Sequence, residues 1–195
     1  MTARTALVFG GSGQIGHALL GRLAGEGWRC VAVSREPRED AEGVQWLTGN
    51  LDPARAPRDL PRHCDAIFSC GPLDLFSAWY AQSAIECGRV VAFGSTSQDA
   101  KREAADPGER ALAEVLRRAE ARILDATAPR GAAATLLRPT LVYGAGRDAN
   151  LTRIARLATR AGFFPLPRGN AGPRPPVHVE DLAAVSPACG SQVSA

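Results

Sequence analysis

Short apolar runs alternate along the chain with segments of helical periodicity. The first run, residues 6–9, predicts a strand, and apolar positions spaced by three and four residues predict a helix after it, ended by Gly25 and Gly27. The apolar positions of this helix are Ile15, Ala18, Leu19 and Leu23. Further strands are predicted at Arg29–Ser34, Val44–Thr48, Ala66–Cys70, Arg89–Gly94 and Ala133–Val142.

Two more helices are predicted between the later strands, at Ser77–Glu86 and Glu109–Thr127. The second has an apolar stripe that we expect to be buried: Leu112, Val115, Leu116, Ala119, Ile123 and Leu124. Strands that alternate with helices predict an α/β fold, a Rossmann-type doubly wound parallel sheet with helices on both faces. In such a sheet, ligands bind at the carboxyl ends of the strands.

Three glycines spaced by two residues follow the first strand. Gly10 allows a sharp turn, Gly13 lets the backbone approach a pyrophosphate, and Gly16 lets the new helix pack closely on its strand. The helix starts at Gln14 and Ile15, where free N–H groups and the helix dipole favour an anion. Strand, turn and helix in this order predict a dinucleotide site formed by these five residues.

The end of the second strand predicts which dinucleotide binds. A ribose 2′-hydroxyl is usually held by an Asp or Glu about 20 residues past the glycine turn, whereas this chain has Ser34 and Arg35 there. A hydroxyl beside a guanidinium suits a 2′-phosphate, so we expect NADP as the preferred cofactor and NAD as the alternative. In the competing interpretation, Arg35 is a solvated loop residue among Glu36, Arg38 and Glu39.

Composition indicates one globular domain, because 45% of the 195 residues are hydrophobic and no linker divides the chain. Five cysteines without a CxxC pair favour reduced thiols, and the three histidines have no ligand-spaced neighbours. The net charge of +3 comes from scattered arginines, which argues against nucleic acid, and no segment predicts a signal peptide or a membrane span. We therefore expect a cytoplasmic protein with a small-molecule substrate.

Five short motifs occur along the chain. They are Gly10-x-x-Gly13-x-x-Gly16, Gly49-Asn50-Leu51, Phe93-Gly94-Ser95-Thr96-Ser97, Arg138-Pro139-Thr140-Leu141-Val142-Tyr143-Gly144 and Val177-His178-Val179-Glu180-Asp181-Leu182-Ala183. In this combination the chain resembles the extended and atypical short-chain dehydrogenase/reductases, also described as the NAD-dependent epimerase/dehydratase family. The resemblance places Asn50 and Leu51 at the adenine, Cys70, Gly71 and Pro72 at the central part of the cofactor, and Pro139, Thr140 and Leu141 at the nicotinamide.

The resemblance implies hydride-transfer chemistry, as an oxidoreductase or a sugar-nucleotide-type epimerase or reductase. Family members normally use a Tyr and a Lys four residues later, and this chain has no such pair. Its only lysine, Lys101, follows Ser97 at that distance, and matching the family's helix would put Asp106 and Arg110 at the two positions.

Three interpretations remain for the chemistry. Ser97 and Lys101 could transfer a proton, or Ser95 or Thr96, at the place of the family's catalytic hydroxyl, could polarise a carbonyl. Alternatively, the protein binds NADP without catalysis, as a sensor or interaction module.

The resemblance also bears on the domain boundaries. We expect a dinucleotide-binding domain over residues 1–185, with a substrate-side segment at roughly 145–180, and an irregular tail over 186–195 because Pro187 and Gly190 interrupt helical periodicity. Family members continue well beyond the motif at Val177–Ala183, so the chain is expected to be truncated. A homodimer is the association that we consider.

Overall fold

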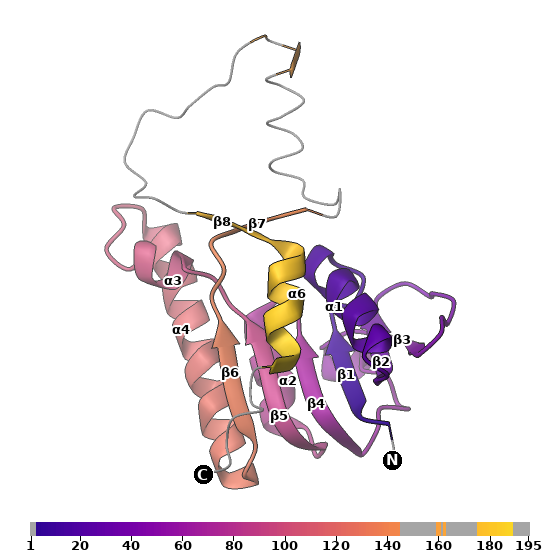
Figure 1. The fold of residues 1–195 in the computed structure, drawn as a ribbon. Helices are drawn as coiled ribbons and strands as arrows, with labels where there is room; N and C mark the ends of the chain where they lie inside the picture. The colour runs from indigo at the N-terminus through magenta and orange to yellow at the C-terminus, as the bar shows by residue number, and fades with distance from the viewer. Residues whose placement is uncertain (1–2, 145–158, 161, 163–174, 189–195) are drawn as a thin grey trace.

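The computed structural model describes residues 3–144, 159–160, 162 and 175–188. Its main sheet has six strands, all parallel, in the order β3-β2-β1-β4-β5-β6 (Figure 1). The strands are β1 (Thr5–Phe9), β2 (Arg29–Ser34), β3 (Val44–Thr48), β4 (His63–Ser69), β5 (Glu86–Phe93) and β6 (Ala133–Leu137). This order reverses direction between β1 and β4, which makes the sheet doubly wound and confirms the predicted fold class.

Helices cover both faces of this sheet. They are α1 (Gln14–Gly25), α2 (Leu73–Gln82), α3 (Ser97–Ala100), α4 (Pro107–Thr127) and α6 (Val179–Ala188), with 3₁₀ turns η1 (Pro53–Arg55) and η2 (Ala128–Arg130). Helices α1 and α6 pack together on one face and α2 and α4 on the other (Figure 1). In the described part of the chain, every helix is too short or too polar to cross a membrane.

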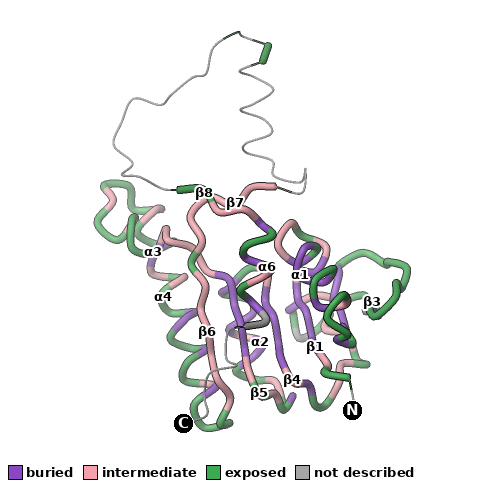
Figure 2. The backbone as a smooth tube through the Cα atoms, viewed as in Figure 1, coloured by how far each residue is buried: buried purple, intermediate pink, exposed green. Residues whose placement is uncertain are grey.

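The sheet separates two hydrophobic cores because successive side chains of a strand point to opposite faces. In β1, Leu7 and Phe9 join the core under α2 and α4, whereas Ala6 and Val8 join the core under α1 and α6. Figure 2 shows the resulting buried centre of the sheet. Burial on both faces explains why the central strands are continuous apolar runs.

The predicted strand Ala133–Val142 is wrong in its second half. The main sheet ends at Leu137, and β7 (Leu141–Tyr143) pairs in parallel with β8 (Pro176–His178) in a separate two-stranded sheet. Pro139 lies between the two pieces and has no N–H to donate to a neighbouring strand, so the ladder of β6 cannot continue through it.

Helix α2 begins at Leu73, earlier than the predicted Ser77, and ends at Gln82. Pro72 occupies the N-cap position with φ −59°, and Asp74 in the first turn suits the positive end of the helix dipole. Its aromatic residues belong to the core. They are Phe76, Trp79 and Tyr80.

The predicted buried stripe of α4 is only partly correct. Ala119 and Ile123 are buried, but Leu112, Val115 and Leu124 are 45%, 44% and 48% exposed. The buried positions of α4 lie on a neighbouring face of the helix: Ala113, Ala119, Glu120, Ile123 and Thr127. A carboxylate therefore takes a position in this face that apolar periodicity alone would not assign to it.

Helix α6 continues to Ala188, beyond the predicted start of the irregular tail at Ser186. Its buried residues Val179 and Ala183 pack in the core shared with α1, and the Ser186 hydroxyl donates to the Leu182 carbonyl at 2.5 Å. These contacts favour the helix despite a proline in its last turn. The rest of the predicted tail, 189–195, lies outside the described residues, and the division at 185/186 stays a prediction.

Candidate functional site

A pocket of about 460 Å³ opens at the carboxyl ends of β1, β2 and β4. Four segments that are distant in sequence line it, and most of the predicted cofactor residues are among them. They include Gly10 and Gly13, Ser34 and Arg35, Asn50 and Leu51, and Cys70, Gly71 and Pro72. The structure thus brings together the glycine turn and the segments assigned to the adenine and to the centre of the cofactor.

The glycine turn is shaped by close backbone contacts. Gly10 has φ +72°, and a Cβ there would lie 2.7 Å from the carbonyl carbon of Cys70 and 2.8 Å from the nitrogen of Gly71. A Cβ on Gly16 would collide with the Gly10 carbonyl group. Gly13 differs, because a Cβ there would meet only the Gly10 oxygen, at 3.3 Å. The fold therefore requires glycine at Gly10 and Gly16, whereas a side chain at Gly13, which lines the pocket, would make one close contact.

No side chain caps the N-terminus of α1 within the described residues, so the first N–H groups of the helix can donate hydrogen bonds to an anion. The Gln14 amide instead donates to the Gly144 carbonyl at 2.9 Å, which ties α1 to the end of β7. Gln14, Ile15 and Gly16 border the turn but do not line the pocket.

The end of β2 carries a hydroxyl and two guanidinium groups. Ser34 is buried, and its Oγ accepts from Arg38 Nε at 3.3 Å, while the Arg38 guanidinium lies 5.3 Å from the centre of the Trp46 ring. Arg35 is exposed and lines the pocket. Two guanidinium groups, one of which lines the pocket, thus lie near the position where an NAD-specific site has a carboxylate.

The segment after β3 also lines the pocket. The side-chain oxygen of Asn50 accepts from the Asp52 backbone N–H at 2.8 Å, and Asp52 in turn caps η1 by accepting from Ala54 N at 3.0 Å. This local bonding fixes the Asn50 amide, whose NH₂ group and second lone pair can meet an adenine edge.

The hydroxyls after β5 form a compact group. Ser95 Oγ is 3.0 Å from Ser97 Oγ and accepts from the Ser97 backbone N–H at 3.1 Å. Thr96 N donates to the Pro139 carbonyl at 3.4 Å, which brings this loop to the one that holds Pro139, Thr140 and Leu141. None of the last three residues lines the pocket described above.

The side chains that could replace the family's Tyr and Lys make other contacts. Lys101 Nζ is 2.9 Å from Glu109 Oε1. Asp106 caps α4 by accepting from Gly108 N at 2.8 Å, and Arg110 donates to the carbonyls of residues 104 and 105 at 2.7 Å each. These contacts give each side chain a structural role at the start of α4.

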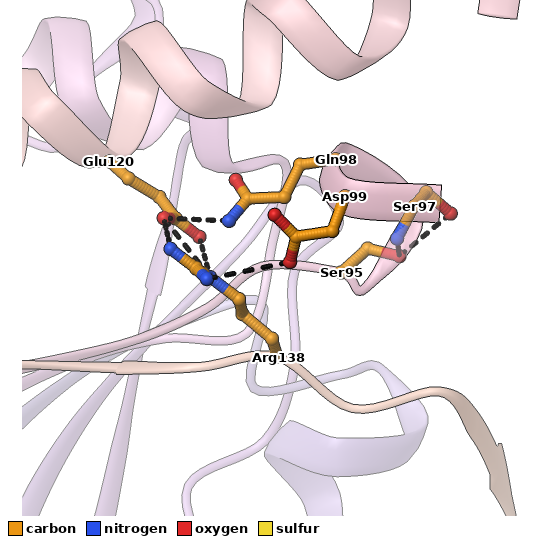
Figure 3. Close-up of polar contacts among 6 residues, drawn as sticks. All are labelled: Ser95, Ser97, Gln98, Asp99, Glu120 and Arg138. Atoms are coloured by element: carbon orange, nitrogen blue, oxygen red, sulfur yellow. Dashed lines mark hydrogen bonds and ion pairs between the residues drawn. The ribbon is translucent and has the colours of Figure 1, made fainter. Parts of the chain in front are cut away.

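A buried carboxylate lies behind the hydroxyl loop (Figure 3). Glu120, 4% exposed, accepts from Arg138 Nε at 2.9 Å and from Gln98 Nε2 at 3.1 Å. Arg138 also lies 3.6 Å from Asp99. Sequence reasoning missed this cluster; the available signal was a glutamate at the spacing of the buried positions of α4, together with an arginine in the motif after β6.

The buried thiols, of which Cys70 lines the pocket, are neutral at physiological pH. Burial raises the pKa of Cys70, beside the glycine turn, to about 12 and that of Cys30 to about 11. A thiol with such a pKa is a poor nucleophile. Among the residues that the structure describes, no three His, Cys, Asp or Glu side chains gather as metal ligands would.

Three features of this site are typical of Rossmann folds that bind dinucleotides. They are a glycine turn, an uncapped helix and a pocket at the point where the strand order reverses. Residues 6–96 match the model of the NAD dependent epimerase/dehydratase family. The match includes the glycine turn and the Gly49-Asn50-Leu51 motif, and it gives this part of the chain the sequence pattern of that family.

Solved structures agree on the fold. MoeE5 in complex with UDP-glucuronic acid and NAD is 21% identical with a TM-score of 0.71, over 97% of this chain and 73% of that one. WbmH from Bordetella bronchiseptica in complex with NAD+ is 14% identical with a TM-score of 0.67 (99% and 74%). The human epimerase family protein SDR39U1 with NADPH is 20% identical with a TM-score of 0.61 (96% and 70%). No curated protein matches the chain significantly.

Proposed function

We propose that this chain binds a nicotinamide dinucleotide in the pocket at the carboxyl ends of β1, β2 and β4. One observation carries the proposal: the pocket joins the open backbone at Gly13 and the uncapped end of α1 to the segments at Arg35 and Asn50. The first two suit a pyrophosphate and the last two an adenosine. The structures of MoeE5, WbmH and SDR39U1, named as complexes with NAD or NADPH, support it.

We further propose a preference for NADP(H) over NAD(H). Arg35 lines the pocket at the end of β2, and Ser34 holds the guanidinium of Arg38 beside it. Two cations attract a 2′-phosphate, whereas an NAD-specific site needs a carboxylate to accept from the 2′-hydroxyl.

The proposed chemistry is that of the epimerase/dehydratase family, on a small-molecule substrate of the sugar-nucleotide type. The bound dinucleotide supplies hydride transfer to or from a carbinol or carbonyl carbon. The chain supplies the hydroxyls of Ser95, Thr96 and Ser97, of which the Ser97 group accepts from Ser95 and can direct its own proton to a substrate oxygen. The MoeE5 complexes with UDP-glucuronic acid and UDP-glucose support this substrate class.

A second candidate function is dinucleotide binding without turnover. It is favoured by the contacts of the residues at the Tyr and Lys positions: Asp106 caps α4 and Arg110 is bound to backbone carbonyls. A carboxylate in a cap cannot take the part of a phenol that donates a proton. A sensor would bind NADPH and leave it unconsumed with a panel of carbonyl compounds, whereas an enzyme would oxidise it.

Calorimetric titration with NADPH and NADH tests the proposal. We expect a micromolar Kd for NADPH, a higher Kd for NADH, and loss of this difference in affinity in Arg35→Ala. Arg29→Ala is the matched control, because Arg29 is exposed at the opposite end of the same strand. If neither NADPH nor NADH binds, the proposed function is refuted. An Arg35→Ala variant that keeps the preference for NADPH would refute the role of Arg35.

A further inference from the structure

We propose that Glu120 is a positioning residue that holds together the two loops at the nicotinamide end of the site. This assignment rests on the dinucleotide function proposed above. Figure 3 shows the Glu120 carboxylate between Arg138, from the end of β6, and Gln98, from α3. The same carboxylate therefore joins three elements: α4, the segment after β5 that includes α3, and the loop after β6.

Glu120 forms a two-point ion pair with Arg138 and a hydrogen bond with Gln98. Arg138 binds the carboxylate through two nitrogens, with Nε 2.9 Å from Oε1 and Nη2 on Oε2. A fork of this kind fixes the orientation of both side chains as well as their separation. Gln98, also buried, donates to Oε2 at 3.1 Å, so the charge of the carboxylate is met from two directions.

The neighbouring backbone is adapted to the carboxylate. A Cβ on Gly94, at the end of β5, would lie 2.9 Å from Glu120 Oε1, closer than real Cβ atoms approach such a group. The Gly94 N–H donates to the Leu137 carbonyl at 2.8 Å, so β5 and β6 stay in contact up to this point. Burying a charge is costly, and the carboxylate is tolerated here because Arg138 and Gln98 donate to it and Gly94 leaves room for it.

The two loops held by Glu120 are those predicted to meet the nicotinamide and the reacting carbon. Arg138 directly precedes Pro139, and Gln98 directly follows the Ser95–Ser97 hydroxyls. Thr96 and Pro139 contact each other through a backbone hydrogen bond of 3.4 Å. The adenosine end of the pocket, at Ser34 and Asn50, belongs to other strands. Loosening Glu120 should therefore weaken binding of the nicotinamide half and spare the adenosine half.

Helix α4 offers a matched control, Glu114. This carboxylate also binds two arginines, Arg117 and Arg118, but both lie on α4 itself and all three side chains are partly or largely exposed. Its contacts therefore connect no loop to another.

The experiment compares Glu120→Gln, Glu114→Gln and the unaltered chain by calorimetry with two probes, NADPH and its adenosine half, adenosine 2′,5′-bisphosphate. We expect Glu120→Gln to weaken NADPH binding about fivefold or more, because altering such clusters changes coupling by this order. The affinity for adenosine 2′,5′-bisphosphate should stay within about twofold, as for a distant site. Glu114→Gln should change neither. Arg138→Lys, which keeps the charge but not the fork, should repeat the selective loss and serves if Glu120→Gln does not fold.

Three results would count against the assignment. Equal losses for both probes, or NADPH affinity unchanged in Glu120→Gln and Arg138→Lys, would overturn the positioning role while leaving the proposed function intact. An unaltered chain that binds neither probe would refute the proposed function, and the assignment would fall with it.

Discussion

Gly13 and Gly16 separate the requirements of the fold from those of binding. In Gly16→Ala the new methyl group would meet backbone atoms, at 2.6 Å from Gly11 Cα and 2.8 Å from the carbonyl carbon of Gly10. Backbone atoms cannot rotate out of the way as a side chain can, so α1 must move off its turn. In Gly13→Ala the nearest atom is 3.3 Å away, and φ −75° with ψ 176° is an ordinary conformation for alanine.

The two changes differ in the free energy of unfolding. Overpacking costs about 1–3 kcal/mol, and the rigid neighbours of Gly16 place Gly16→Ala at about 3 kcal/mol. For a chain of this size that loss lowers Tm by roughly 6–12 °C. For Gly13→Ala, a poorer N-cap costs about 0.5–1 kcal/mol, and the lower entropy of the unfolded chain returns about 0.4–1 kcal/mol. Its net effect is therefore close to zero.

Gly13→Ala should weaken binding although it leaves stability almost unchanged. The methyl group of Gly13→Ala occupies the space through which a pyrophosphate would reach the backbone, and we expect NADPH affinity to fall about tenfold or more, equivalent to about 1.4 kcal/mol. Thermal denaturation and calorimetric titration of both variants test this. A Gly13→Ala variant that melts as early as Gly16→Ala, or that binds NADPH as tightly as the unaltered chain, would refute the reasoning.

Three further predictions concern stability and thiol chemistry. Ile123→Ala should cost about 2–5 kcal/mol, whereas Leu112→Ser on the exposed face of α4 should stay within about 0.5 kcal/mol in urea denaturation. Asp106→Ala removes the cap of α4 and should cost about 1 kcal/mol, with Asp106→Asn as the control that keeps it. Burial raises the pKa of Cys30 to about 11 and of Cys64 to about 12, so at pH 8 both stay protonated. Neither should react with a thiol reagent until denaturant is added, and rapid labelling of the native protein would contradict this.

The strands and the glycine turn could be predicted because their signals are local. β2 has the predicted bounds, since an apolar run buried on both faces leaves little choice. β3 also has the predicted bounds, although it is an edge strand and only partly buried. The division of Ala133–Val142 into two strands could also have been read locally, because Pro139 interrupts the run. The apolar residues on both sides concealed that signal.

The buried face of α4 and the contacts of Glu120 could not be predicted in the same way. Periodicity gives the apolar positions of a helix, but Leu112 and Val115 show that an apolar residue need not be buried. Glu120 is buried because Arg138 reaches it from the end of a strand 18 residues later, and a pairing of this kind depends on tertiary structure. The residues of the pocket were easier to predict, since the carboxyl ends of parallel strands meet at one edge.

The pairing of β7 with β8 fixes where the chain leaves the part that holds the six-stranded sheet and where it returns. Tyr143 and His178 are register partners, and their rings pack edge to face with centroids 5.0 Å apart. A connection between two such neighbouring ends can vary in length at low cost, because doubling the length of a loop costs only about 0.6 kcal/mol in closure entropy. The β7–β8 pair therefore holds both ends of this connection, so a change in its length should leave the six-stranded sheet in place.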